Sequence, residues 1–283
     1  MVLGAGASYP YWFPTAKELK NRICEAFSDP NTAGSRLLGG RNASQFVEFR
    51  EAFWKSGVPS VEAFLERRTE FLEVGKLAIA YCLIPYEHEA NLYHPREQAG
   101  DWYEYLSGKL NASFDEFGNN KLSIITFNYD RSLEHYLFTS LRSLHGRSID
   151  DCLEKLAKVP IIHVFGQLGT IQYPQRGCRE YLPLGGDEGK VRDAVLDAAA
   201  GITLLHQEAS DLNEARKLLG AAERVCFLGF GYHPLNLSRL TLEDSADRRR
   251  WVFGTVLHFE TGEVLQTKRR LTQTMLSGRV SMM

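Results

Sequence analysis

The sequence predicts an α/β protein built on a mostly parallel sheet. Three observations predict this class: four short apolar runs with strand character, helical segments between them, and glycine or polar residues where the runs end. Strands that alternate with helices are typical of a parallel sheet whose crossovers are helical. With 283 residues, of which 44% are hydrophobic, the chain is long enough for one domain with a sizeable core and an additional helical module.

The chain begins with a very short apolar segment and a glycine turn, in the sequence MVLGAGASYP. Residues 1–3 are all that is available for a first strand, which is shorter than the usual five or six residues. Gly4 and Gly6 permit a sharp turn and a close approach of the backbone to a ligand. Two interpretations stay open, a tight structural turn or a phosphate cradle, because the third glycine of a dinucleotide fingerprint is absent.

A long helical stretch follows the glycine turn. Thr15 is expected as an N-cap, and Glu18 three residues later completes a capping box. Residues 29–43 are rich in Gly, Asn and Ser and are expected to form a loop. Three further helices are expected at 44–56, at 60–89 with a break at Pro85, and from 101 onward. We therefore expect a helical sub-module over residues 29–118, inserted between the glycine turn and the next strand.

The rest of the chain alternates between strands and helices. Strands are expected at 121–130, 159–169, 224–236 and 250–259, and helices at 131–141, 187–201 and 210–223. The nearly continuous apolar character of the first two strands is typical of central parallel strands that are covered on both faces.

Polar residues follow or end two of these strands. Asn128 and Asp130 are two residues apart, so they lie on the same side of the strand end. In parallel sheets the carboxyl ends of the strands meet at the edge where ligands bind. Asp130 is also explained as a cap of the following helix, an interpretation that fits Asn128 less well. His163, inside an apolar strand, is either a ligand-facing residue or a satisfied core histidine.

The composition excludes several classes. The 33 basic and 35 acidic side chains give a net charge of -2, so no basic field indicates nucleic-acid binding. The five cysteines form no CxxC pair, which argues against a structural zinc site. Their number is odd and their spacings are wide, which resembles no disulfide framework, and we expect a reducing, cytoplasmic location. No apolar run approaches the roughly 20 residues that span a bilayer, so no membrane association is expected.

The motifs GAGAS, TFNYD, HVFGQLG and FLGFGYHPLN, in this order and spacing, resemble the SIR2-like domains of bacterial anti-phage defence, which are distant relatives of sirtuins. The resemblance extends over the helical segment that begins SVEAFLE and the closing WVFGTVLHFETGEV, and so over nearly the whole chain. It implies a single domain, residues 1–283, with a Rossmann-like NAD-binding core. It also implies an NAD⁺ hydrolase that releases nicotinamide and ADP-ribose and defends the cell by NAD depletion.

The resemblance further implies roles for individual residues. Asn128 would hold the nicotinamide ribose and a water, Asp130 would bind the carboxamide, and His163 would be the base near the ribose hydroxyls. Phe165 occupies the position where sirtuins have their histidine, and His163 precedes it by two residues on the same strand face. The residues implied in binding the rest of NAD are Gly4, Ala5, Gly6, Ala7, Ser8, Pro14, Phe127, Gly166, Gly229, Gly231, Asn236 and Thr255.

The chain lacks the two CxxC pairs of deacetylating sirtuins, which favours water over acyl-lysine as the acceptor. No metal and no zinc-dependent deacetylase activity are expected. The resemblance implies a homo-oligomer and a partner such as a HerA-type ATPase. Two other functions stay open. One is a regulatory or scaffold subunit that binds NAD or ADP-ribose without turnover, which Phe165 supports, and the other is transfer of ADP-ribose to a macromolecule.

Overall fold

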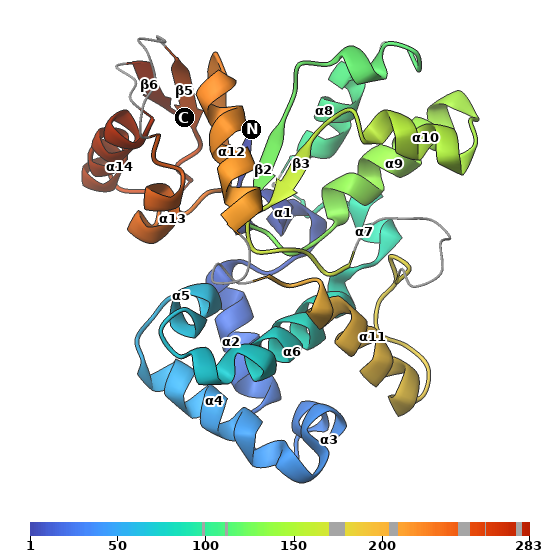
Figure 1. The fold of residues 1–283 in the computed structure, drawn as a ribbon, viewed down its shortest axis with the longest axis vertical. Coiled ribbons are helices and arrows are strands. Elements are labelled where there is room, and N and C mark those ends of the chain that lie inside the picture. The colour runs from blue at the N-terminus through green and yellow to red at the C-terminus, as the bar shows by residue number, and fades with distance from the viewer. Residues whose placement is uncertain are drawn as a thin grey trace.

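The computed structural model describes residues 1–97, 100–110, 113–169, 179–203, 209–242, 250–257, 259–275 and 279–283. Within these ranges six parallel strands form one sheet in the order β3-β2-β1-β4-β5-β6, which confirms the α/β class (Figure 1). This is the strand order of doubly wound, Rossmann-like folds. The strands are β1 (Val2–Leu3), β2 (Ile124–Thr126), β3 (Ile161–His163), β4 (Arg224–Leu228), β5 (Trp251–Gly254) and β6 (Arg279–Met282).

The very short first strand lies at the centre of the sheet. Val2 pairs with Ile125 of β2 on one side and with Phe227 of β4 on the other. The ladder continues beyond the strand, because the Gly4 N–H donates to the Leu228 carbonyl over 3.1 Å. Two residues therefore suffice for a strand here, since neighbouring strands satisfy the backbone on both sides.

The helices of the first half are α1 (Ala5–Ser8), α2 (Ala16–Ala26), α3 (Ala33–Gly39), α4 (Ala43–Lys55), α5 (Val61–Leu65), α6 (Leu72–Leu83), α7 (Glu89–Tyr93) and α8 (Trp102–Leu110). Those of the second half are α9 (Ser132–His145), α10 (Ile149–Leu156), α11 (Glu188–Ala200), α12 (Ala209–Ala221), α13 (Pro234–Arg239) and α14 (Thr261–Thr274). The capping box of Thr15 and Glu18 is confirmed at the start of α2. Ser60 caps α5, and a 3₁₀ turn that contains Pro85 follows α6.

Several expected boundaries are wrong. The loop expected at 29–43 contains α3, which begins because the Thr32 hydroxyl accepts the Ser35 N–H. The single helix expected at 60–89 is divided into α5 and α6. Gly75 of α6 lets Leu65 of α5 approach closely, since a Cβ at Gly75 would lie 2.5 Å from a Leu65 methyl carbon. This contact packs α5 against α6.

The second half of the chain holds further differences. The strand expected at 224–236 ends at Leu228, and the one expected at 250–259 ends at Gly254. The strands expected at 121–130 and 159–169 are likewise only three residues long, as β2 and β3. Helices α7, α10, α13 and α14 and strand β6 were not predicted from the sequence.

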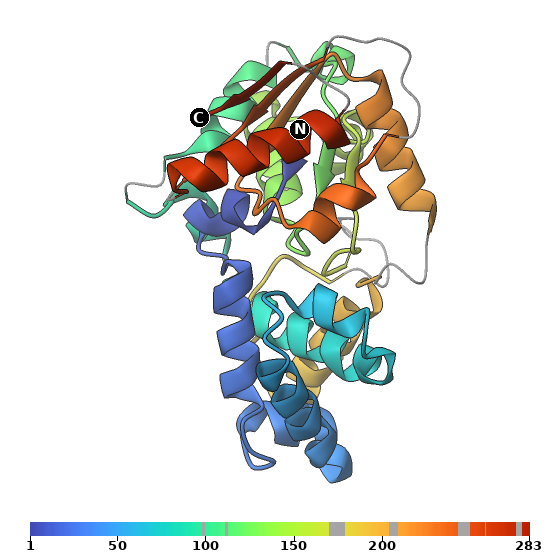
Figure 2. The same cartoon turned by 90° about the vertical axis from the view of Figure 1, so that its left-hand side faces the viewer.

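Helices cover both faces of the sheet, with α8, α9 and α10 on one side and α12, α13 and α14 on the other (Figures 1 and 2). A second, purely helical body lies below the carboxyl ends of the strands. It contains α2 to α6, and α11 joins it from the second half of the chain by packing on α6 and α3. The phenylalanines in the core of this body include Phe27, Phe46, Phe49, Phe53 and Phe64.

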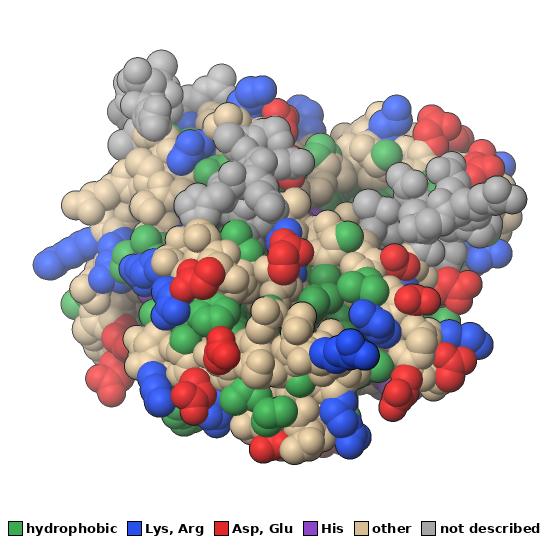
Figure 3. All heavy atoms as spheres, turned by 60° about the horizontal axis from the view of Figure 1, so that its bottom comes forward, with side chains coloured by type: hydrophobic (Ala, Val, Ile, Leu, Met, Phe, Trp, Pro, Cys, Tyr) green, Lys and Arg blue, Asp and Glu red, His purple; other side chains and the backbone are tan. Residues whose placement is uncertain are grey.

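The outer face of the helical body is chemically mixed. Figure 3 shows acidic and basic side chains interspersed with hydrophobic ones over this side of the molecule. The arrangement agrees with the nearly balanced totals of 33 basic and 35 acidic residues. Among the helices that the structure describes, none combines the length and the apolar character that a bilayer crossing requires.

Candidate active site

A small pocket lies where β2 and β3 end, beside the turn that follows β1. Its lining residues are Leu3, Ser8, Tyr103, Thr126, Asn128, Asp130, Leu133, Glu134, Ile161 and His163. The structure thus brings together all three expected catalytic residues, Asn128, Asp130 and His163. The open space at the centre of the pocket is about the size of one water molecule.

Asn128 connects the pocket to the glycine turn. Its side-chain Nδ2 donates to the Gly4 carbonyl and to Ser8 Oγ, each over 3.0 Å. Its Oδ1 is buried, and no described residue donates a hydrogen bond to it. A buried acceptor without a donor is costly, so Oδ1 is a natural partner for a ligand hydroxyl or a water.

His163 has an acceptor at each ring nitrogen. Nδ1 lies 2.8 Å from the Asn128 carbonyl oxygen, and Nε2 lies 2.5 Å from Glu134 Oε1. Burial opposes protonation of the ring, but the Glu134 carboxylate and the Asn128 carbonyl outweigh it and raise the pKa of His163 above its ordinary value. The geometry therefore favours the imidazolium form, with both N–H groups donating.

Asp130 is held by the start of α9. Its Oδ1 accepts the Ser132 N–H over 3.2 Å and also the Ser132 hydroxyl, while Tyr103 and Ser132 share a hydroxyl–hydroxyl hydrogen bond of 2.6 Å. Asp130 therefore accepts the first N–H of α9, although the N-cap residue is Arg131, and it also lines the pocket. Burial is the largest influence on this carboxyl group and raises its pKa.

The glycine residues pack backbone against backbone. A Cβ at Gly4 would lie 2.7 Å from the Gly229 carbonyl oxygen, and a Cβ at Gly6 would lie 2.9 Å from Gly229 Cα. Gly229 itself has a φ of 57°, which favours glycine. The Gly6 N–H donates to the Gly229 carbonyl over 2.9 Å, so this N–H is not free to bind phosphate. Close packing of the turns after β1 and β4 thus accounts for these glycines.

The other residues expected to bind NAD lie outside the pocket lining, except for Ser8. Gly166 has a φ of 72° and packs on the backbone of residues 201–203. Thr255 Oγ1 accepts the Gly229 N–H over 3.0 Å. The Phe127 ring packs on two other phenylalanine rings of the core, and Asn236 Oδ1 accepts a hydrogen bond from Arg239. The remaining expected residues, which also do not line the pocket, are Ala5, Ala7, Pro14 and Gly231.

Three polar residues of the pocket, Glu134, Thr126 and Tyr103, were not predicted from the sequence. Glu134 lies in the first turn of α9, four residues after Asp130, and this spacing was the available signal because it places both carboxylates near one strand end. Thr126 ends β2, and its hydroxyl accepts the Asn128 N–H over 3.0 Å. Tyr103 comes from α8, and nothing in the sequence connects it to β2.

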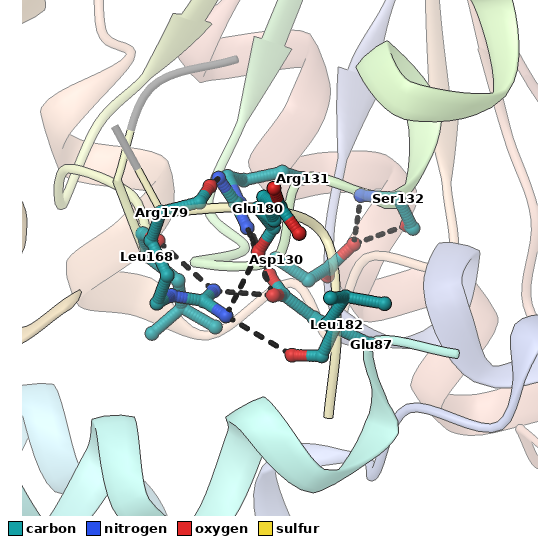
Figure 4. A network of polar contacts seen from close by, with 8 residues as sticks. All are labelled: Glu87, Asp130, Arg131, Ser132, Leu168, Arg179, Glu180 and Leu182. Carbon is teal, nitrogen blue, oxygen red and sulfur yellow. Dashed lines mark hydrogen bonds and ion pairs between the residues drawn. The ribbon is translucent and has the colours of Figure 1, made fainter. Parts of the chain in front are cut away.

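A buried ion-pair network lies next to Asp130 (Figure 4). Arg131 binds Glu87 through two hydrogen bonds, Nε to Oε1 over 3.1 Å and Nη2 to Oε2 over 2.9 Å. Arg179 pairs with the same carboxylate, and Arg131 Nη1 donates to the Arg179 carbonyl over 2.9 Å. The network holds the backbone next to Asp130 in place. It also connects residues 179–182 to the start of α9, because Arg131 donates to the carbonyls of Arg179 and Glu180.

The pocket thus contains an imidazole, two carboxylates and an amide oxygen without a hydrogen-bond donor. Among the described residues, no three His, Cys, Asp or Glu side chains are placed to hold a metal ion. Comparison with known proteins adds no identification, because no family model, curated protein or solved structure matches the chain.

Proposed function

We propose that the chain is an NAD⁺ glycohydrolase, which cleaves the bond between nicotinamide and ribose with water as the acceptor. The observation that supports it best is the convergence of Asn128, Asp130 and His163 on one pocket. The pocket adjoins the turn after β1, close to the point where the strand order reverses between β1 and β4. Ligands of doubly wound sheets bind at this point, outside the carboxyl ends of the strands.

The chemistry of the pocket suits this reaction. Cleavage of an N-glycosidic bond passes through a transition state with positive charge on the ribose. Asp130 and Glu134 are negative and the His163 imidazolium is positive, so the pocket has a net negative charge around it. Asn128 Oδ1 is available to accept a hydrogen bond from a ribose hydroxyl or from the attacking water. Nicotinamide leaves as a neutral pyridine and needs no proton. Because the open space is about that of one water, the lining side chains must move apart when a ribose binds.

The experiment is an assay of nicotinamide release from NAD⁺ by the purified full chain. Asn128→Ala removes the amide that faces both the pocket and the glycine turn, and we expect a loss of about 100-fold or more. Asn213→Ala is the matched control, because Asn213 is exposed on α12, and it should retain full activity. Absence of nicotinamide release, together with equal NAD levels in cells that express the wild type and Asn128→Ala, would contradict the proposal.

The biological role in the proposal is NAD depletion in the cytoplasm as an effector of anti-phage defence. The resemblance to SIR2-like domains supports this role, as well as activity in a homo-oligomer or with a HerA-type ATPase. Sedimentation of the purified chain, alone and with a candidate partner, tests the assembly. A monomer that is fully active alone would contradict regulation by assembly.

A second candidate function is a subunit that binds NAD or ADP-ribose without cleaving it. The occupied ring nitrogens of His163 and the small open space of the pocket favour this alternative. Calorimetry with ADP-ribose separates the two functions. Binding of ADP-ribose without any release of nicotinamide from NAD⁺ over hours would support the silent subunit.

A further inference from the structure

The proposed hydrolysis needs a group that takes a proton from the attacking water. The resemblance implies that His163 is this base, but the structure places an acceptor at each of its ring nitrogens. The Asn128 carbonyl at 2.8 Å has no proton to give, so Nδ1 must be the donor of that hydrogen bond. Nε2 faces a carboxylate oxygen at 2.5 Å. A ring that donates at both nitrogens has no lone pair left to accept a proton.

We propose that Asp130 takes the proton from the water, and that Glu134 is a positioning residue that keeps His163 a doubly protonated donor. This inference rests on the proposed hydrolase function. The water oxygen bonds to the ribose carbon as the carbon–nitrogen bond to nicotinamide breaks, and the electron pair of that bond leaves on the pyridine nitrogen. The water proton passes to the Asp130 carboxylate and from there to solvent.

The surroundings of Asp130 suit its role as the general base. Both hydrogen bonds from Ser132 reach the same oxygen, Oδ1, and the Ser8 side chain is a further hydrogen-bond partner of the carboxylate. An ionised carboxylate accepts about four hydrogen bonds, so Asp130 keeps the capacity to accept one from a water. The side chain lines the pocket, although only 8% of the residue is exposed. Burial makes this carboxylate more basic than a solvated aspartate, which improves proton transfer near neutral pH. His163, Glu134, Tyr103 and Tyr181 are the titratable groups around it, and the first three line the same pocket.

The ion pair of His163 and Glu134 also suits the charge of the reaction. An isolated imidazolium beside the ribose would repel the positive charge of the transition state. The carboxylate at 2.5 Å makes the pair neutral overall, so the ionised Asp130 leaves the pocket with a net negative charge. Such a pocket stabilises positive charge on the substrate.

The first experiment measures protonation and needs no activity. In the full chain with ¹⁵N-labelled histidine, long-range ¹H–¹⁵N spectra report both ring nitrogens, and His163→Gln identifies the signals. We expect both nitrogens of His163 to carry protons at neutral pH, and Glu134→Gln to lower the proton affinity of the ring roughly tenfold or more. Glu89→Gln, which removes the glutamate near another buried histidine, should leave His163 unchanged. One unprotonated His163 nitrogen at neutral pH in the wild type would overturn the inference.

The second experiment compares kinetics of nicotinamide release. We expect Asp130→Asn to lower kcat about 100-fold or more with KM for NAD⁺ changed by less than about threefold, and His163→Gln to cost less. Glu134→Gln should shift the pH profile, which a purely structural role would leave in place. Asp130→Asn that folds and keeps wild-type kcat, or that is less harmful than His163→Gln, would overturn the inference. If the wild type releases no nicotinamide, the proposed function fails, and the spectra still test the state of His163.

Discussion

His163 and His135 are both buried but have opposite electrostatic surroundings. They are 8% and 3% exposed, respectively. His135, on α9, stacks on the Tyr181 ring at a centroid distance of 4.2 Å and an angle of 11°. Burial, together with the charge of Arg131 one turn earlier, lowers its pKa to about 4. His163 instead has a carboxylate at 2.5 Å, and its pKa is raised.

A close carboxylate partner outweighs burial at His163, whereas burial keeps His135 neutral. Burial acts in the same direction on both rings and favours the neutral form. His135 also has a carboxylate nearby, but Glu89 lies 3.9 Å from its Nε2 and has a side chain that is 55% exposed. Water screens this charge, whereas Glu134 is only 13% exposed. Four substitutions test the comparison.

The largest effect is expected from Arg131→Met, which removes the cation beside His135 and leaves Glu87 without its two-bond partner. Losing one member of a buried ion pair should lower the free energy of unfolding by about 3–5 kcal/mol. The pKa of His135 should rise towards its ordinary value. Urea unfolding measures the first effect and a histidine titration by NMR the second. Arg142→Met, at an exposed position of the same helix, is the control, and an Arg131→Met chain as stable as this control would contradict the expectation.

The second-largest effect is a loss of free energy of unfolding in acid, which we attribute to His135. Its pKa is about 4 in the folded chain and 6.5 as an ordinary value, so the unfolded chain binds the proton more tightly. The free energy of unfolding is therefore undiminished above pH 6.5, and it decreases by up to about 3 kcal/mol as the pH falls towards 4. His135→Phe keeps a ring against Tyr181 and should flatten this loss. Urea unfolding between these pH values measures it, and identical slopes for variant and wild type would contradict the assignment.

Glu134→Gln should make His163 resemble His135. Because the folded pKa of His163 is raised, the stability from its ion pair is complete below the unfolded value and is lost as the pH rises through the folded pKa. We expect the substitution to lower the free energy of unfolding by about 1–3 kcal/mol in mild acid and by less in alkali. Urea unfolding at the two conditions checks the sign. A larger loss in alkali than in acid would mean that His163 is neutral.

Glu89→Gln should have the smallest effect. The glutamate is more than half exposed and lies at the edge of ion-pair distance from His135. We expect the free energy of unfolding to change by less than about 0.5 kcal/mol. Thermal or urea unfolding is sufficient to measure it. A loss as large as that of Glu134→Gln would show that partner exposure is not what separates the two histidines.

The sequence predicted the part of the site that depends on strand ends. Asn128, Asp130 and His163 could be placed together because parallel strands deliver their carboxyl ends to one edge. Glu134 and Tyr103 were missed, since their approach to the pocket depends on how α9 and α8 pack, which no local pattern specifies. The glycines were identified as sites where another group approaches the backbone closely. A bound ligand and a second backbone turn both require that no side chain is present there, so both explain a glycine. The sequence alone could not decide between them.

Element types were likewise easier to predict than element ends. The capping box at Thr15 was correct because it depends on two neighbouring side chains. The break between α5 and α6 was missed because it depends on the contact of Leu65 with Gly75, which forms only when the chain has turned. The predicted strands were longer than the observed ones, because apolar residues continue beyond the segments that pair in the sheet.

The position of α11 affects the order in which the chain can fold. The helical body takes α2 to α6 from the first third of the sequence, but α11 is residues 188–200, and it packs on α6 and α3. During synthesis the first five helices emerge long before this last one, and the face of α6 that it covers stays open until then. Strands β2 and β3 also precede α11 in the chain. They can therefore pair with each other, and bring Asn128 and His163 together, before the helical body is complete. Contacts of such long sequence separation slow folding, and we expect this face of α6 to be the last part of the helical body to gain protection from hydrogen exchange.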